Sequence, residues 1–241
     1  MFLVTAAAFL LAGFVKGMIG MGLPTVAIGL LSVVMLPSEA AALLVVPTIV
    51  TNIWQLVVGS NLLPLTRRLW AMLVTSALVT NAASGLLTDQ NGRATVALGV
   101  ALICYAIVGL AKVQFSAPAW TEAWLGPMIG AATGLIAGAT GVMALPAVAY
   151  FQAIGLDKED MIQALGLSFT ISMLALAAGL AREGAFHSAI VGSSLLALVP
   201  ASAGMLVGQW VRLRVRPDVF RFCFFLGLLG LGAHLVLRSA L

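Results

Sequence analysis

One lysine stands inside a glycine-rich apolar segment and could bind a negatively charged group. Residues 13–24 read Gly-Phe-Val-Lys-Gly-Met-Ile-Gly-Met-Gly-Leu-Pro, with Lys16 as their charged member. A cation inside an apolar span is energetically expensive and usually has a partner or faces a cavity. The alternative is a lysine near the end of a short helix, whose head group reaches the membrane interface. We predict that Lys16 is a counter-charge for an anion.

A second segment, residues 134–146, repeats this pattern about half a chain later. It reads Gly-Leu-Ile-Ala-Gly-Ala-Thr-Gly-Val-Met-Ala-Leu-Pro, so three glycines and a proline recur at nearly the same spacing, while alanine replaces the lysine. Glycine exposes the backbone and proline removes a donor, so each segment predicts a helix broken into two half-helices. A half-helix that begins within a membrane presents free N–H groups and a partial positive charge, which suits an anion. Close helix packing is the alternative for Gly13, Gly17, Gly138 and Gly141.

Polar side chains on the next predicted span could donate hydrogen bonds to the same anion. The span from about 40 to 59 contains Thr48, Thr51, Asn52 and Gln55. They are three, four or seven residues apart and therefore share a helix face. Joining neighbouring helices is their alternative role. At an offset of 120 residues, Asn52 falls on Ser172 in the second half. The predicted substrate-binding residues are Lys16, Gly17, Gly20, Gly22, Pro24, Thr48, Asn52, Gln55, Gly138, Thr140, Gly141, Pro146, Ser168 and Ser172.

The composition places these residues in a lipid bilayer. Hydrophobic residues make up 62% of the 241 and charged residues 8%, and the mean hydropathy is +1.13. Such a chain cannot supply enough polar surface to cover a water-soluble globule. Most of its uncharged stretches reach the ~20 apolar residues that one helical crossing needs. The predicted fold is therefore an all-α integral membrane protein surrounded by lipid.

The duplicated segments divide the chain into two repeats. We predict a first repeat over residues 1–112, a linker over 113–123 and a second, inverted repeat over 124–241. Each repeat is expected to contain a broken, re-entrant helix hairpin and about three full spans. Inverted repeats with discontinuous helices are a common plan of secondary transporters, whose substrate site lies near the midplane between the repeats.

The distribution of cations favours the hairpin over a single crossing of each broken stretch. With hairpins, eight cations share one side, which the positive-inside rule places in the cytoplasm, and three face the other. The eight are Arg67, Arg68, Lys112, Lys158, Arg212, Arg214, Arg216 and Arg221, and the three are Arg93, Arg182 and Arg238.

At these residues the chain resembles the sulfite exporter TauE/SafE family of transporters for sulfur-containing and related organic anions. The resemblance covers essentially the whole chain. It rests on the duplicated glycine motif ending in Pro24 and Pro146, on the polar patch near Asn52, and on the stretch from Gly204 to Gly208 before a basic loop. It implies a secondary carrier or exporter for anions such as sulfite, thiosulfate, sulfonates or carboxylates, working by alternating access.

Other functional classes have weaker support in the sequence. An anion channel or facilitator is the first alternative, because duplicated breaks also occur in channels. An intramembrane hydrolase would need a serine nucleophile and a histidine base. Ser193 and His234 supply these types, but there is no G-x-S-x-G elbow. We therefore expect no enzymatic activity, no cofactor and no metal site. The cations lie at segment ends, which does not indicate a nucleic-acid surface. The expected location is the cell membrane, most simply a bacterial inner membrane, with a homo-oligomer as an open alternative.

Overall fold

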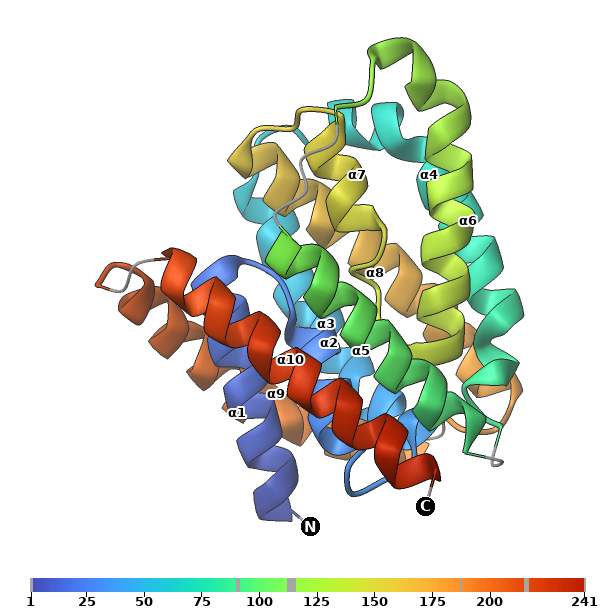
Figure 1. Cartoon of the computed structure of the whole chain (residues 1–241), viewed down its shortest axis with the longest axis vertical. Coiled ribbons are helices and arrows are strands. Elements are labelled where there is room, and N and C mark those ends of the chain that lie inside the picture. The colour runs from blue at the N-terminus through green and yellow to red at the C-terminus, as the bar shows by residue number, and fades with distance from the viewer. Residues whose placement is uncertain (1, 90–91, 112–115, 187, 215–216, 241) are drawn as a thin grey trace.

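The computed structural model describes residues 2–89, 92–111, 116–186, 188–214 and 217–240, and its described part is built from helices (Figure 1). Lys112, Arg216 and part of the predicted linker lie outside the described residues. The elements in chain order are α1 (Phe2–Ile19), α2 (Leu23–Leu31), α3 (Pro37–Val58), α4 (Leu62–Ala83), the 3₁₀ turn η1 (Ser84–Leu86), α5 (Arg93–Ala111), the 3₁₀ turn η2 (Ala119–Thr121), α6 (Glu122–Thr140), α7 (Ala147–Ala153), α8 (Lys158–Arg182), α9 (Ser188–Arg212) and α10 (Pro217–Ala240).

Eight of the described helices are long and apolar enough to cross a bilayer, and α2 and α7 are the two short ones. The predicted all-α membrane fold is confirmed. Large apolar side chains cover the outside of the bundle, as expected of a surface in contact with lipid. Examples that are more than half exposed are Trp54, Trp70, Leu78 and Val199.

Both predicted helix breaks are present. Between α1 and α2 the backbone turns at Gly20 and Gly22, whose φ angles of 81° and 100° favour glycine over other residues. Pro24 lies in the first turn of α2, where its missing N–H leaves no hydrogen bond unmade. The second break begins at Gly141, with φ 74°, and α7 starts directly after Pro146.

The two helical pieces on either side of each break differ in length. α1 has 18 residues and α2 nine, while α6 has 19 and α7 seven. Gly17 and Gly138 remain inside the long helices because those helices pack closely on neighbours there. A Cβ on Gly17 would collide with the backbone of α9, and one on Gly138 would lie 2.7 Å from the Thr80 carbonyl oxygen of α4. Close packing therefore keeps these two glycines in a helical conformation, although the sequence alone marks them as helix-breaking residues.

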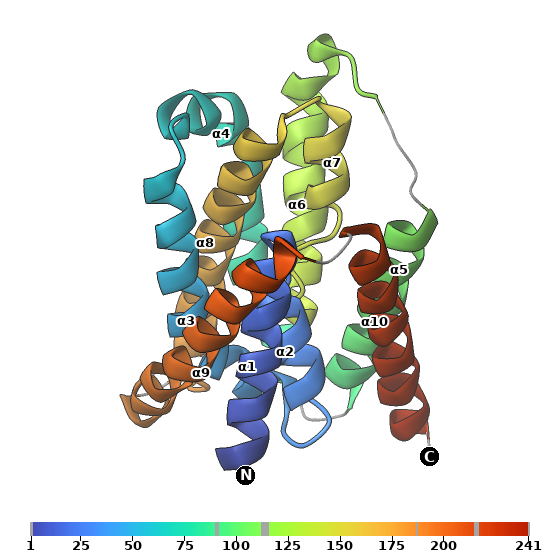
Figure 2. The same ribbon diagram turned by 90° about the vertical axis from the view of Figure 1, so that its left-hand side faces the viewer.

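The long broken helices pack across the two halves of the chain. α1 of the first half lies along α9 of the second, and α6 of the second half lies along α4 of the first. Between these pairs α3 packs on α8, and α5 packs on α10 along one side (Figures 1 and 2). The two halves of the chain are therefore interleaved and do not form two separate bundles.

Each broken stretch returns to the end of the bundle from which it started. In Figure 2, α1 begins at the end that carries both termini, and the loop from α2 to α3 returns there. α6 begins at the opposite end, and the loop from α7 to α8 returns to that end. These are the predicted hairpins. The exact twofold relation between the repeats stays a prediction.

Polar contacts tie the helix ends together. At one end Arg68 donates to Glu122, with an N–O distance of 2.6 Å, and to the Ile154 carbonyl at 3.1 Å. At the other end Arg182 donates to the Asn81 side chain at 3.0 Å. These contacts join α4 to α6 and α8 near the membrane surfaces, where water screens them, so we assign each pair at most about 1 kcal/mol.

Candidate functional site

Lys16 lies in the last turn of α1, just before the first break, and its side chain points into the bundle. The residue is 3% exposed. Its Nζ atom donates to Oγ1 of Thr51 at 3.0 Å and to Oδ1 of Asn52, both on α3. The ammonium group is therefore held between α1 and α3 instead of reaching the membrane interface.

The acceptors of this ammonium group are neutral. The salt bridges of the described residues join Arg68 to Glu122 and Arg182 to Glu183, and none includes Lys16. Neutral oxygens satisfy hydrogen bonds but leave the positive charge uncompensated. A buried charge without an opposite charge carries a desolvation penalty of several kcal/mol. The surroundings of Lys16 would be improved by an anion.

Asn52 offers a free donor beside this charge. Its Oδ1 accepts from Lys16, whereas its Nδ2 is buried and has no hydrogen-bond partner among the described residues. The hydroxyls of Thr48, one turn earlier on α3, and of Ser168 on α8 are also buried and unpartnered there. Such groups are uncommon in folded proteins and need an explanation. An acceptor-rich ligand would supply one for Asn52.

The first break is held in place by α3. Nε2 of Gln55 donates to the carbonyl oxygen of Gly20 at 2.7 Å, which satisfies a backbone group that the end of α1 leaves free. Gly22 precedes α2 as its N-cap, and the intrahelical bonds of α2 begin with Val26 donating to the Gly22 carbonyl at 2.9 Å. Gln55 therefore has a structural partner here, on the same helix face as Asn52.

The second break is stabilised mainly by its own residues. Oγ1 of Thr140 donates to the Ile136 carbonyl at 2.6 Å and accepts from the N–H of Val142 at 3.2 Å. Gly141 lies against the Ile28 side chain of α2, where a Cβ would collide. The second break therefore contacts the short helix that follows the first break.

A family model described as sulfite exporter TauE/SafE matches residues 5–235. The chain belongs to the TauE/SafE family. No curated protein and no solved structure matches it. TauE/SafE proteins are membrane transporters, which agrees with the eight apolar helices and gives the general function as transport.

In this TauE/SafE member, the predicted site residues divide into four groups. Lys16, Asn52, Gln55 and Gly20 meet at the first break. Gly22 and Pro24 shape the start of α2, as Thr140, Gly141 and Pro146 shape the second break. Gly17 and Gly138 lie in helix contacts, as in the packing alternative, and Ser172 bonds Ser76 at 3.0 Å. Thr48 and Ser168 are the unpartnered hydroxyls.

Two further polar residues are outside the list of predicted binding residues, although Thr51 was named as a possible hydrogen-bond donor on the face of Asn52. Thr51 accepts from Lys16 and donates to the Pro47 carbonyl at 2.6 Å, and its place on the face of Asn52 was a signal for it. Thr25 has a buried hydroxyl without a partner among the described residues, and it follows Pro24 directly. The glycine–proline motif predicts that Thr25 lies at the start of a helix, but it does not predict that the Thr25 hydroxyl is buried.

The hydrolase alternative gains no support from the serine pair on α9. Oγ of Ser194 donates to the Leu43 carbonyl at 2.7 Å and accepts from the Val46 N–H at 3.2 Å. Leu43 is four residues before Pro47, so it carries the carbonyl that a proline inside α3 excludes from the helix ladder. Ser193 is exposed on the outside of the bundle. Ser194 therefore satisfies the Leu43 carbonyl of α3, which Pro47 leaves without its helical hydrogen bond.

Proposed function

We propose that this TauE/SafE protein carries small sulfur-containing or organic anions across the cell membrane, with sulfite, thiosulfate, sulfonates and carboxylates as the substrate class. Transport would proceed by alternating access around the two helix breaks. The observation that carries the proposal is the enclosed ammonium group of Lys16, which is bonded to neutral oxygens. The family name supports the sulfur-containing class.

The groups around Lys16 favour an anion over a cation. Lys16 supplies an amino group that an anion would hold in its charged ammonium form, and the Nδ2 group of Asn52 supplies a donor. No cluster of three or more acidic, cysteine or histidine residues that could bind a metal ion occurs in the described chain. An oxyanion placed here would gain charge-assisted hydrogen bonds, which are roughly twice as strong as those between neutral groups.

Access to this site requires helix movement, because Lys16 is almost wholly enclosed in the described conformation. The first break offers a hinge, since Gly20 and Gly22 already hold backbone angles that other residues rarely adopt. The Gln55 bond to Gly20 links this hinge to α3. The contact between Gly141 and Ile28 joins the second break to α2. A movement of α2 would therefore displace residues at both breaks.

The test is counterflow in proteoliposomes with labelled sulfite and a labelled short-chain sulfonate. We expect unlabelled substrate inside the vesicles to accelerate uptake, and we expect Lys16→Met, which keeps the length and removes the charge, to reduce uptake at least tenfold. Lys158→Met is the matched control, because Lys158 is exposed at the start of α8, and it should transport normally. Flux without trans-stimulation would identify a channel instead, and full activity of Lys16→Met would overturn the assigned site.

A further inference from the structure

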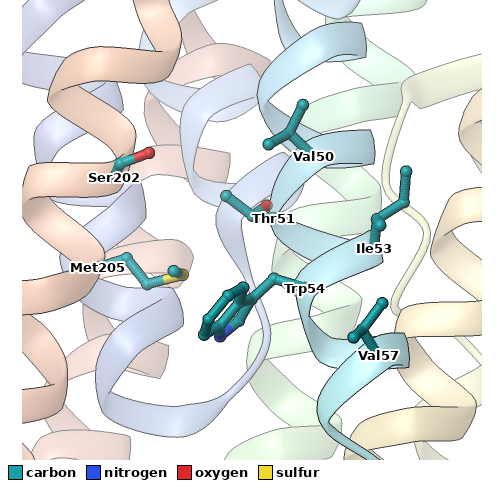
Figure 3. A pocket seen from close by; sticks show the side chains of 7 residues that line it. All are labelled: Val50, Thr51, Ile53, Trp54, Val57, Ser202 and Met205. Atoms are coloured by element: carbon teal, nitrogen blue, oxygen red, sulfur yellow. The ribbon is translucent and has the colours of Figure 1, made fainter.

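An open groove lies between α3 and α9 on the lipid-facing side of the bundle (Figure 3). Its volume is about 370 Å³, within the range of small-ligand pockets. It is lined by Val50, Thr51, Ile53, Trp54, Val57, Ser202 and Met205. Figure 3 shows Met205 of α9 pointing across the groove toward the ring of Trp54 on α3.

The walls of this groove suit an apolar occupant better than a small anion. The side chains of Val57 and Trp54 are 75% and 61% exposed, so they offer apolar surface to the surroundings. Thr51 is buried at the back, and its hydroxyl is engaged by Lys16 and by the Pro47 carbonyl. That hydroxyl therefore has no proton left to donate to a ligand in the groove.

One face of α9 continues from the groove to a positive charge. Ser202, Met205, Gln209 and Arg212 are spaced three, four and three residues apart, so they follow one side of the helix. From Met205 to Arg212 the helix rises about 10 Å, at roughly 1.5 Å per residue. Beyond it the Arg214 guanidinium lies 3.4 Å from the centre of the exposed Trp210 ring, a pairing typical of the membrane interface. Along this face the apolar Met205, the amide of Gln209 and the guanidinium of Arg212 follow one another. This order matches the acyl chain, the ester region and the phosphate of a phospholipid.

We propose that this groove binds an anionic phospholipid, with one acyl chain between α3 and α9 and the phosphate at Arg212. The occupant is a lipid because the groove opens on the bilayer side of two spans and ends at a cation on the same helix face. Neutral lipids would enter the same groove but would not gain the contact with the guanidinium group. This binding is separate from transport, although Thr51 separates the acyl chain from Lys16 by a single side chain.

Quenching of Trp54 fluorescence by brominated lipids tests this proposal. The protein is reconstituted in phosphatidylcholine containing brominated phosphatidylglycerol or brominated phosphatidylcholine, and Trp54→Phe isolates the Trp54 signal from the other four tryptophans. We expect the wild type to prefer phosphatidylglycerol about fivefold, the ratio that corresponds to roughly 1 kcal/mol for one arginine beside an anionic headgroup. Arg212→Gln should abolish the preference.

Arg67→Gln is the matched control, because it removes an exposed arginine from α4 instead of α9 and should keep the preference. Three outcomes would overturn the proposal. They are equal quenching by both lipids in the wild type, a preference that survives Arg212→Gln, and a Trp54 signal that no brominated lipid quenches because protein covers the groove. None of these outcomes depends on transport, so the proposed function is judged separately.

Discussion

The Lys16 side chain has partners that satisfy its hydrogen bonds without balancing its charge. Thr51 and Asn52 accept from Nζ, yet both are neutral, and Lys16 is 3% exposed. Taking an ammonium group out of water costs several kcal/mol, which the attraction of an opposite charge offsets only in good geometry. A lysine kept only for stability would therefore be a poor choice here. This supports the proposed role of Lys16 as a counter-charge for an anion.

Asn52→Asp provides a residue-scale prediction that differs from simple loss of the lysine. The substitution places a carboxylate next to Nζ and supplies an internal anion for the ammonium group. We expect the affinity for sulfite or a sulfonate to fall at least tenfold, about 1.4 kcal/mol, because the substrate must compete with the new ion pair. Isothermal titration calorimetry of the purified protein measures the change.

Asn81→Asp is the control for this substitution. Asn81 lies at one end of α4 and accepts a bond from Arg182, far along the chain from the first break. A carboxylate there meets an arginine already in place, so substrate affinity should not change. Equal losses in both variants would show that added negative charge, and not the position of Asn52, weakens binding.

The packing of α1 on α9 shows at the element scale how glycines act in pairs. Gly13 and Gly17 of α1 face Ala201, Gly204 and Gly208 of α9, and backbone atoms come so close that a Cβ on any of the four glycines would collide. Small residues allow such close contact between membrane helices, where van der Waals packing drives association. A similarly close backbone contact occurs where Gly130, Gly134 and Gly138 of α6 meet α4, which contributes no glycine of its own.

Gly204→Ala is therefore predicted to destabilise the protein. A methyl group there would clash with the Leu10 carbonyl of α1, and overpacking of this kind costs typically about 1–3 kcal/mol. The free energy of unfolding can be measured by titration with sodium dodecyl sulfate from a mild detergent.

Gly192→Ala makes the same substitution on α9 at a position where no other described helix packs against the glycine. No atom lies within 4 Å of a Cβ built at Gly192, so the added methyl group meets open space. Alanine has the higher helix propensity by up to about 1 kcal/mol, which predicts unchanged or slightly raised stability. Similar destabilisation by both substitutions would refute the packing account.

The cross-packing of the two halves is the clearest feature at the scale of the whole molecule. α1 lies on α9 and α6 lies on α4, while α3 and α8 meet between them. A twofold relation between the halves would produce this exchange, because α1 corresponds to α6 and α9 to α4. The pattern supports the proposed inverted repeats, and the opposite directions of the two hairpins in Figure 2 agree with it.

The cation distribution makes a prediction for the whole molecule in its membrane. With Cys104 and Cys223 replaced by alanine, single cysteines at Glu159 and Glu183, both exposed, mark the two ends of α8. The positive-inside rule places position 159 in the cytoplasm and 183 outside. In intact cells a membrane-impermeant maleimide should label Glu183→Cys and should label Glu159→Cys only after permeabilisation. The reverse pattern would mean that the cation bias does not orient this protein.

The sequence by itself determined the membrane class, the helical fold, both breaks and the family. Apolar length, paired glycines and prolines are local properties, and they act on the backbone wherever the chain places them. Local properties also marked Lys16 and the face that carries Asn52 as candidates. Gly17 and Gly138 show where such reasoning stops, because the same residue type breaks a helix or packs it closely depending on what lies opposite.

Tertiary structure alone decided which residues meet. Thr51 and Asn52 are bonded to Lys16 across 35 and 36 positions of sequence, and Ser194 reaches Leu43 across 151. These contacts depend on the angles and positions at which the long helices cross, and no local sequence pattern encodes that geometry. The unequal lengths of α1 and α2, and the groove between α3 and α9, follow from the same crossings. Lys16 is a candidate by its place in the sequence, but only the position of α3 gives its charge a set of neutral neighbours.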